Sequence, residues 1–230
     1  MLLTSHPFIS LKSAWCRFIL LLTPLVSGEK IQAQIPVELF SGNKKSSVDI
    51  MFFKFLKNKD GNNSRVLFFN RNRAVIDYQM TSNTYLPQFG FTEAFSFNHP
   101  SLKGFAPVGV VQIFGTGVFA KAGIQFARIT THSTFFSWLV CETRQSPAID
   151  LFFLGRYTPP LTEKWNLFLQ LELVNAFPSN QQRSFSFTQR ARAGLKQKAF
   201  QFGLGSDYSQ TGRGTFSSLL NTGGFIRYEF

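Results

Sequence analysis

The chain has 230 residues, enough for one domain with a large core, and no break in composition divides it. Charged residues make up 16% of the chain, against roughly 25% in soluble domains, whereas 29 residues are Phe. The net charge is +12, but the basic residues are scattered and no aromatic ribonucleoprotein motif accompanies them. Nucleic-acid binding is therefore disfavoured, and the composition favours a protein with little surface in bulk water.

The first 33 residues have the pattern of an export signal. Lys12 and Arg17 form a positive flank before an apolar run over residues 18–26, which is too short to cross a bilayer as a helix. Small residues follow, and Ala33 offers a cleavage site. The sequence therefore predicts a signal peptide over residues 1–33 and export of the rest.

Residues 34–230 form the predicted exported domain, which contains one cysteine, Cys141. The other cysteine, Cys16, precedes the apolar run and follows a Trp, so the leader is not a lipoprotein signal. A single thiol excludes both an intrachain disulfide and a cysteine-rich metal site. We interpret Cys141 as a small apolar residue that is buried or faces lipid.

After the leader, apolar and polar side chains alternate with a period of two, as in a β-strand with one apolar face. The clearest run covers residues 164–174, where Trp165 and the leucines at every second position after it share a face. Alternation recurs in other runs on both sides of this one, although Phe119 departs from it in residues 118–127 and Glu93 in residues 85–97. Turn signals separate eleven predicted strands: 47–57, 64–79, 84–97, 105–114, 117–129, 134–143, 148–157, 164–176, 182–195, 198–209 and 217–230.

Strands of about ten residues joined by short turns are typical of an antiparallel up-and-down transmembrane β-barrel. Bacterial barrels of this kind have even strand numbers, so the short segment 35–40 is expected to supply a twelfth strand. The alternative is ten strands, with one segment outside the barrel. A soluble secreted β-barrel or sandwich has similar alternation, and the pattern alone does not say which face is inside.

Two features favour the membrane over water. The polar faces are rich in Gly, Ser, Thr and Gln instead of Lys and Glu. Aromatic residues also fall near predicted strand ends, where the girdles of membrane barrels lie. The residues expected in such girdles are Tyr85, Trp138, Tyr157, Trp165, Tyr208 and Tyr228.

At the C-terminus, Ile226, Tyr228 and Phe230 alternate with Arg227 and Glu229. This segment resembles the terminal strand of bacterial outer-membrane proteins, which ends on Phe with aromatic or apolar residues at alternate positions before it. With the leader and the strand rhythm, the chain resembles small bacterial outer-membrane β-barrels as a class. The resemblance implies an outer-membrane location and recognition of Ile226, Tyr228 and Phe230 by the barrel-assembly machinery.

If the polar faces point inward, charged side chains line the lumen. In a narrow barrel such charges form a network of ion pairs that fills the lumen, and in a wider one an excess of arginine favours anions. The predicted lumen charges are Lys121, Asp150, Arg156, Glu172, Arg190, Arg192, Asp207, Arg227 and Glu229.

Lipid-modifying chemistry would require a His with a Ser and an acid near the rim. The candidates are His99, which lies in a turn, and His132 with Ser133 and Glu142. Adjacent strand residues point to opposite faces, so His132 and Ser133 do not converge easily. The sequence has no nucleophile elbow or phosphate loop, and we assign no catalytic, cofactor-binding or metal residues.

The leading interpretation is a non-enzymatic outer-membrane barrel that serves as a scaffold or accessory subunit of a larger membrane complex. The alternatives are a small pore for anions or small solutes, a lipid-modifying barrel enzyme and a soluble secreted β-protein. Expected partners are outer-membrane lipid, the assembly machinery during biogenesis and a larger outer-membrane complex, but not nucleic acid. No cofactor is expected.

Overall fold

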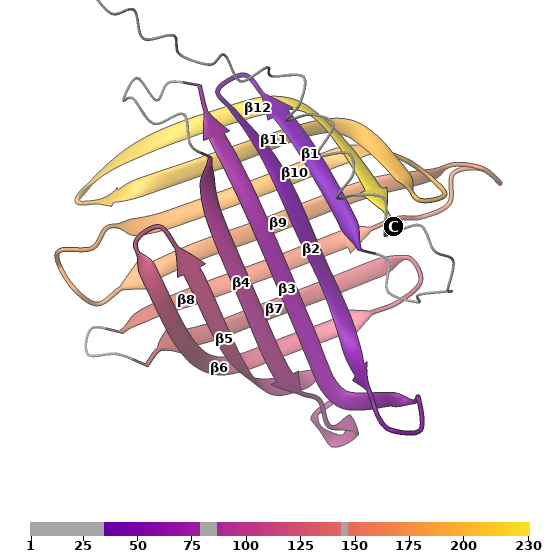
Figure 1. The fold of residues 1–230 in the computed structure, drawn as a ribbon. Coiled ribbons are helices and arrows are strands. Elements are labelled where there is room, and N and C mark those ends of the chain that lie inside the picture. Colours follow the sequence, from indigo (N-terminus) through magenta and orange to yellow (C-terminus); the bar gives the residue numbers. More distant parts are fainter. Residues whose placement is uncertain (1–34, 79–86, 144–146) are drawn as a thin grey trace, which may run out of the picture. The chain divides into compact units, whose positions relative to one another are not determined.

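The computed structural model describes residues 35–78, 87–143 and 147–230 (Figure 1). The predicted leader, residues 1–33, and the predicted girdle residue Tyr85 lie outside the described residues. None of the described helical segments is long and apolar enough to cross a membrane.

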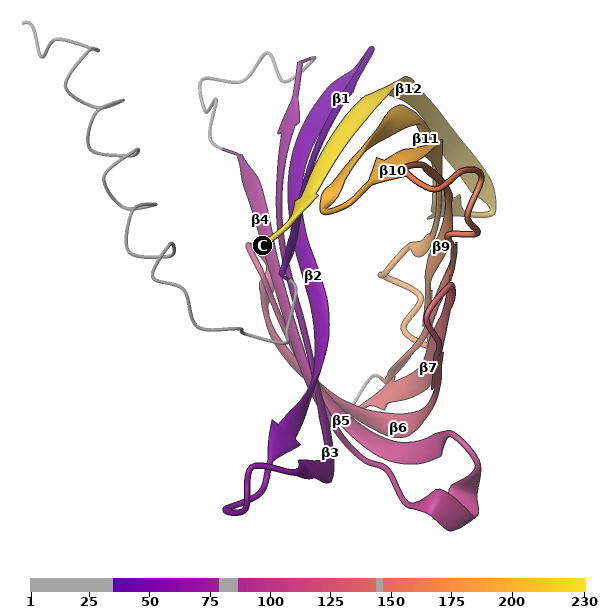
Figure 2. The same ribbon diagram turned by 90° about the vertical axis from the view of Figure 1, so that its right-hand side faces the viewer.

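Twelve antiparallel strands in the described ranges pair in sequence order and form a closed barrel (Figures 1 and 2). A short 3-10 helix, η2, covers Pro100–Leu102. Segment 35–40 falls mostly in the first strand, so the prediction of twelve strands is confirmed. The strands are β1 Pro36–Gly42, β2 Lys45–Lys57, β3 Asn63–Asp77, β4 Gln88–Phe97, β5 Phe105–Phe114, β6 Gly117–Ile129, β7 Ser133–Glu142, β8 Ala148–Tyr157, β9 Asn166–Pro178, β10 Phe185–Gln197, β11 Phe200–Arg213 and β12 Thr215–Glu229.

The sheet closes where β1 meets β12. Pro36 lies opposite Glu229, and the register continues to Gly42 opposite Gly223. One step further, the backbone N–H of Ile35 donates to the carbonyl of Phe230 at 3.1 Å, and the reverse bond has the same length. The last residue of the chain therefore takes part in closing the barrel, and no strand edge is left without a neighbour.

The outer face of the barrel is apolar, and the charged side chains of the strands lie mainly inside, beside a cluster of apolar ones. Along β9, Leu169 and Leu171 point outward and are 38% and 45% exposed, whereas Glu172 points into the lumen and is 1% exposed. Exposed Phe, Leu, Ile and Val side chains cover the outer face of the other strands in the same way. A soluble barrel has the opposite polarity, so the chain is a barrel of the transmembrane type. The expectation of a membrane barrel is confirmed, and the soluble alternative is wrong.

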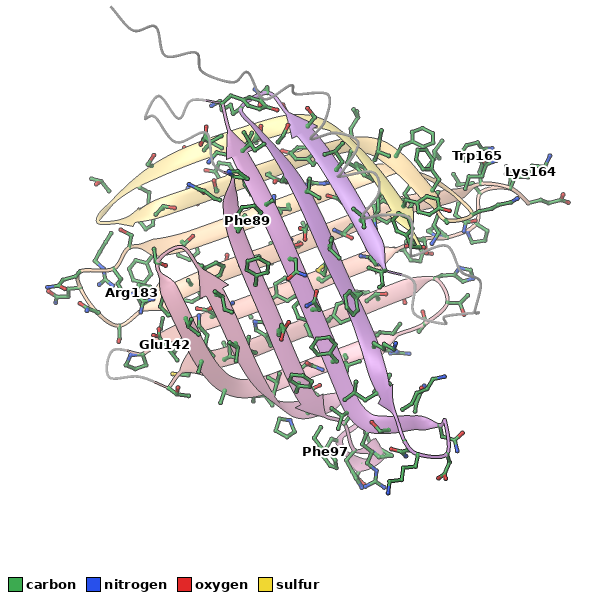
Figure 3. All side chains as sticks on the ribbon, viewed as in Figure 1. Phe89, Phe97, Glu142, Lys164, Trp165 and Arg183 are labelled. Carbon is green, nitrogen blue, oxygen red and sulfur yellow. The ribbon has the colours of Figure 1, made fainter. Side chains whose placement is uncertain are left out.

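The first residue of β1 and the last residue of β12 lie at the same end of the barrel, as an even number of antiparallel strands requires. We call this the terminal end. It also holds the connections that follow β2, β4, β6, β8 and β10, and Lys164 and Trp165 mark it in Figure 3. The opposite, distal end holds the connections after the odd-numbered strands, and Glu142 and Arg183 mark it.

The C-terminal aromatic pattern faces outward. Ile226, Tyr228 and Phe230 are 51%, 45% and 58% exposed, while Arg227 and Glu229 between them are buried in the lumen. The ring centroids of Tyr228 and Phe230 lie 4.7 Å apart in a T-shaped contact. The three side chains are accessible from outside, and their recognition by the assembly machinery stays a prediction.

The predicted aromatic girdle is correct only in part. Tyr157 and Tyr228 lie outward near strand ends, about half exposed, as expected. Trp138 instead faces the lumen and is 4% exposed. Both faces of its strand β7 are apolar, so alternation could not show which face points inward. Phe69 on the opposite wall contacts the indole inside the lumen, with ring centroids 5.0 Å apart.

Two glycines opposite each other let β10 and β11 approach closely. Gly194 of β10 pairs with Gly203 of β11, and a Cβ built on Gly203 collides with the carbonyl oxygen of Ala193. Gly224 of β12 faces outward, and a Cβ there has its nearest neighbour at 3.7 Å. The two positions therefore differ in the space available for the same added methyl group.

We predict that Gly203→Ala lowers the free energy of unfolding by about 1–3 kcal/mol, because the added methyl group has no room beside the β10 backbone. Gly224→Ala should change it by less than about 0.5 kcal/mol. Urea titration in detergent micelles measures both variants. Equal stability of the two would contradict the close approach of β10 and β11.

Candidate functional site

The lumen holds the charged side chains, so it is the candidate site. All nine residues predicted to line it lie on the inner face of their strands: Lys121, Asp150, Arg156, Glu172, Arg190, Arg192, Asp207, Arg227 and Glu229. The structure adds further charged groups from the first three strands that the sequence analysis did not single out: Glu38, Asp49, Arg71 and Arg73.

One contact joins opposite walls of the barrel. Arg71 of β3 donates from Nη1 to Glu172 Oε1 of β9 at 2.7 Å, and the two residues are 101 positions apart in the chain. Arg71 also binds Asp49 on the neighbouring strand β2, and Glu172 also accepts from Arg190 on the neighbouring strand β10. Each member of the cross-lumen pair therefore has a second partner of opposite charge on its own wall.

Asp207 of β11 links a second set of charges. Its Oδ1 accepts from Arg192 at 2.6 Å, and its Oδ2 accepts from Arg73 on the opposite side at 3.1 Å. Arg192 also donates from Nε to Glu38 of β1 at 3.0 Å. Because these groups come from strands distributed around the barrel, the ion pairs tie its walls together across the lumen.

Arginines outnumber carboxylates in this network. Arg156 and Arg227 share one neutral acceptor, Gln170, and their guanidinium groups lie 5.9 and 5.7 Å from the ring of Phe168. Arg227 has a weak ion pair with Glu38 at 3.9 Å, and its Nε and Nη2 atoms have no hydrogen-bond partner among the described residues. Six arginines (71, 73, 156, 190, 192 and 227) therefore face four carboxylates (38, 49, 172 and 207).

The remaining inward charges pair locally. Lys121 binds Asp150, and Lys196 donates to Glu229 at 2.6 Å. At the distal rim, Arg183 contacts Glu142 at 2.9 Å (Figure 3). These pairs are balanced in charge, so the excess of positive charge is concentrated around the arginine network.

The other part of the lumen is an apolar core. Phe69 of β3 stacks on Phe136 of β7 with ring centroids 5.4 Å apart and also contacts Trp138 and Phe152. All four side chains are at most 4% exposed. Figure 2 shows β2 and β4 on one wall facing β7 and β9 on the other. The aromatic contacts fill this region of the lumen, and Phe69, Trp138 and Phe152 also border the cavity described next.

A cavity of about 870 Å³ lies at the distal end of the barrel, and its lining combines lumen residues with Phe89, Phe91 and Ile113 from the outer side of the rim. The turn residues Gly115 and Thr116 contribute to its mouth, and Arg71, Arg73 and Arg190 contribute to its floor. Below that floor, the space beside Glu172, Arg192 and Arg227 is only about 10 Å³, about what one water needs. The lumen is therefore a vestibule that ends at the arginine network.

The residues considered for lipid-modifying chemistry do not come together. Glu142 ends β7 at the distal end, whereas His132 precedes the start of that strand at the terminal end. His99 accepts from the backbone N–H of Ser101 and caps η2. Within the described ranges, no group of three His, Cys, Asp or Glu residues is arranged to hold a metal ion. Cys141 faces outward and is exposed, in agreement with a lipid-facing position.

No protein-family model matches the chain, and no curated protein matches its sequence. Solved structures with a similar fold include the KdgM porin, 9% identical over 86% of this chain and 99% of that chain, with a TM-score of 0.45. The NanC porin is 9% identical over 86% and 98%, with a TM-score of 0.47. The β domain of the Bordetella autotransporter BrkA is 11% identical over 86% and 99%, with a TM-score of 0.38. At these values the likeness concerns the fold alone.

We predict that Arg71 and Glu172 are energetically coupled. In a double-mutant cycle of Arg71→Ala and Glu172→Ala, the coupling in unfolding free energy should be about 1–3 kcal/mol, because the pair is buried and joins two walls. The matched cycle of Arg71→Ala with Glu142→Ala should be additive within about 0.5 kcal/mol, since Glu142 pairs with Arg183 at the rim. Additivity in both cycles would show that the cross-lumen contact does not form.

Proposed function

We propose that the chain forms a narrow, non-enzymatic pore for small anionic solutes in the bacterial outer membrane, closed in this conformation by the contact between Arg71 and Glu172. The observation that carries the proposal is the distal vestibule of about 870 Å³ with three arginines in its floor. An excess of fixed positive charge at the narrowest part of a lumen favours anions over cations.

The pairing pattern supports an opening step of modest cost. If Arg71 and Glu172 separate, Arg71 keeps Asp49 and Glu172 keeps Arg190. If Arg73 and Asp207 separate, Arg73 likewise keeps Asp49 and Asp207 keeps Arg192. Breaking a buried ion pair is expensive mainly when it leaves a charge alone, and here no charge is left alone. The aromatic core around Phe69 stays packed, so the path runs along the charged side of the lumen.

Two features favour this pore over the scaffold that was the leading interpretation of the sequence. A filled scaffold has no need of a cavity of about 870 Å³ at one end of its lumen, nor of more arginines than carboxylates in the network at the floor of that cavity. The arginine network also lies in line with the vestibule, as a constriction must. The role of an accessory subunit concerns the outer face of the barrel and is compatible with a pore.

The test is conductance in planar bilayers. We predict that the native chain gives rare openings, and that Glu172→Ala raises the open probability at least about tenfold, because Arg71 is released to Asp49. In a KCl gradient the reversal potential should have the sign of an anion-selective pore. Glu163→Gln, in the exposed turn between β8 and β9, is the matched control and should behave as the native chain.

Heat-modifiable mobility on gels establishes that each variant is folded before its conductance is recorded. A folded Glu172→Ala barrel that remains silent would exclude the pore. A conducting barrel with cation selectivity would exclude the role given to the arginines.

A further inference from the structure

Among the described strands, the outer face of the barrel carries one acid, Glu93, midway along β4. Glu93 interrupts the phenylalanines of β4 and points outward between Phe91 and Phe95, which are 41% and 52% exposed. Figure 3 shows Phe89 and Phe97 at the two ends of the same strand, so Glu93 lies near the middle of the apolar belt. All other acidic residues in the described strands face the lumen.

Two asparagines of β3 extend this polar site. Asn70 lies opposite Glu93 and donates from Nδ2 to its Oε1 at 3.4 Å, and Asn72 donates to Asn70 Oδ1 at 3.1 Å. We call Asn70, Asn72 and Glu93 the outer polar patch. No cation of the described residues forms an ion pair with Glu93. A carboxylate that faces hydrocarbon with one weak hydrogen bond is costly and calls for a partner.

The surface beside the patch has room for such a partner. Val111 of β5 lies opposite Glu93, and Gly109, two residues away on the same outer face, lies opposite Phe95. A Cβ built on Gly109 meets nothing within 4 Å, so the outer surface is open at this glycine, beside Phe95 and one outward position from the residue opposite Glu93. Small residues at such positions let a neighbouring membrane segment approach closely.

We propose that the outer polar patch docks a membrane-embedded partner protein that presents a lysine or arginine side chain at the depth of Glu93. Charge complementarity selects this occupant over a second copy of the chain. The outward-facing cations within the described strands are Lys54, three residues from the terminal end of the 13-residue strand β2, and Arg128, one residue from the terminal end of β6, whereas Glu93 lies midway along β4. Copies related by an axis along the membrane normal stay at equal depth, so neither cation reaches the Glu93 of a neighbour.

The proposal is independent of the pore, because it concerns the opposite face of β3 and β4. The probes are two polyleucine transmembrane peptides that differ only in a central Arg or Gln, mixed with the folded full chain in phosphatidylcholine vesicles. Energy transfer between labelled peptide and labelled barrel reports association. The native chain should bind the Arg peptide about tenfold more tightly than the Gln peptide, as expected for one charged hydrogen bond in a membrane.

Three variants make the result specific. Glu93→Gln keeps the shape of the side chain and should bind both peptides equally. Gly109→Phe places a bulky side chain on the open surface beside the patch without changing the charge, and it should weaken binding of the Arg peptide about tenfold. Gln189→Leu removes an outward polar group on β10 and should keep the full preference.

Equal binding of both peptides by the native chain, or a preference that survives Glu93→Gln, would overturn the proposal. Self-association of the native barrel without peptide that is lost in Glu93→Gln would also overturn it, and would assign the patch to a second copy. Gel mobility with and without heating shows that each variant is folded.

Discussion

Closure of the sheet between β1 and β12 is the constraint on which the rest of the structure depends. In hydrocarbon, an unpaired backbone N–H or C=O costs several kcal/mol, so a sheet crossing a membrane must leave no open edge. The seven paired positions from Pro36 to Gly42, and the bonds between Ile35 and Phe230 beyond them, meet that requirement. Once the sheet is closed, every strand has one face toward lipid and one toward the lumen, and alternation sorts the side chains between them.

The lumen then has to accommodate what the outer face excludes. One part is packed with aromatic rings around Phe69, and the other holds arginines and carboxylates that no surface in lipid tolerates. Several of these charges hold a second partner on their own wall as well as one across the lumen, as Arg71 and Glu172 do. This redundancy means that separating one cross-lumen pair leaves each of these charges with a partner of opposite sign on its own wall. Glu93 is the exception on the outer face, and it points to a neighbour in the membrane.

Much of this architecture could be predicted from the sequence, because alternation and turn residues act locally. Predicted strands 105–114, 117–129 and 148–157 coincide with β5, β6 and β8. The rule that bacterial barrels have an even number of strands correctly required a twelfth strand near residue 35. The inward positions of Glu172, Arg190 and Arg192 followed from the same alternation, since their strands have one clearly apolar face.

The rest of the lumen depends on contacts that a local pattern does not contain. Asn70, Arg71, Asn72 and Arg73 follow one another in β3, so both faces of the strand are polar there and alternation does not show which face is inside. Their partners Glu172 and Asp207 are more than 100 positions away. Trp138 is held inside by Phe69, which is likewise distant in sequence. Where one face of a strand is clearly apolar, the sequence therefore predicted which side chains point inward. It did not predict which of them pair across the lumen.

The central claim is that the apolar faces meet lipid and the charged faces meet the lumen, and β9 tests it most directly. Single spin labels at positions 168 to 173 of the otherwise cysteine-free barrel in lipid vesicles report access to oxygen, which concentrates in hydrocarbon. We expect high oxygen access at 169, 171 and 173 and low access at 168, 170 and 172. High access at the even positions, or equal access along the whole strand, would contradict the account.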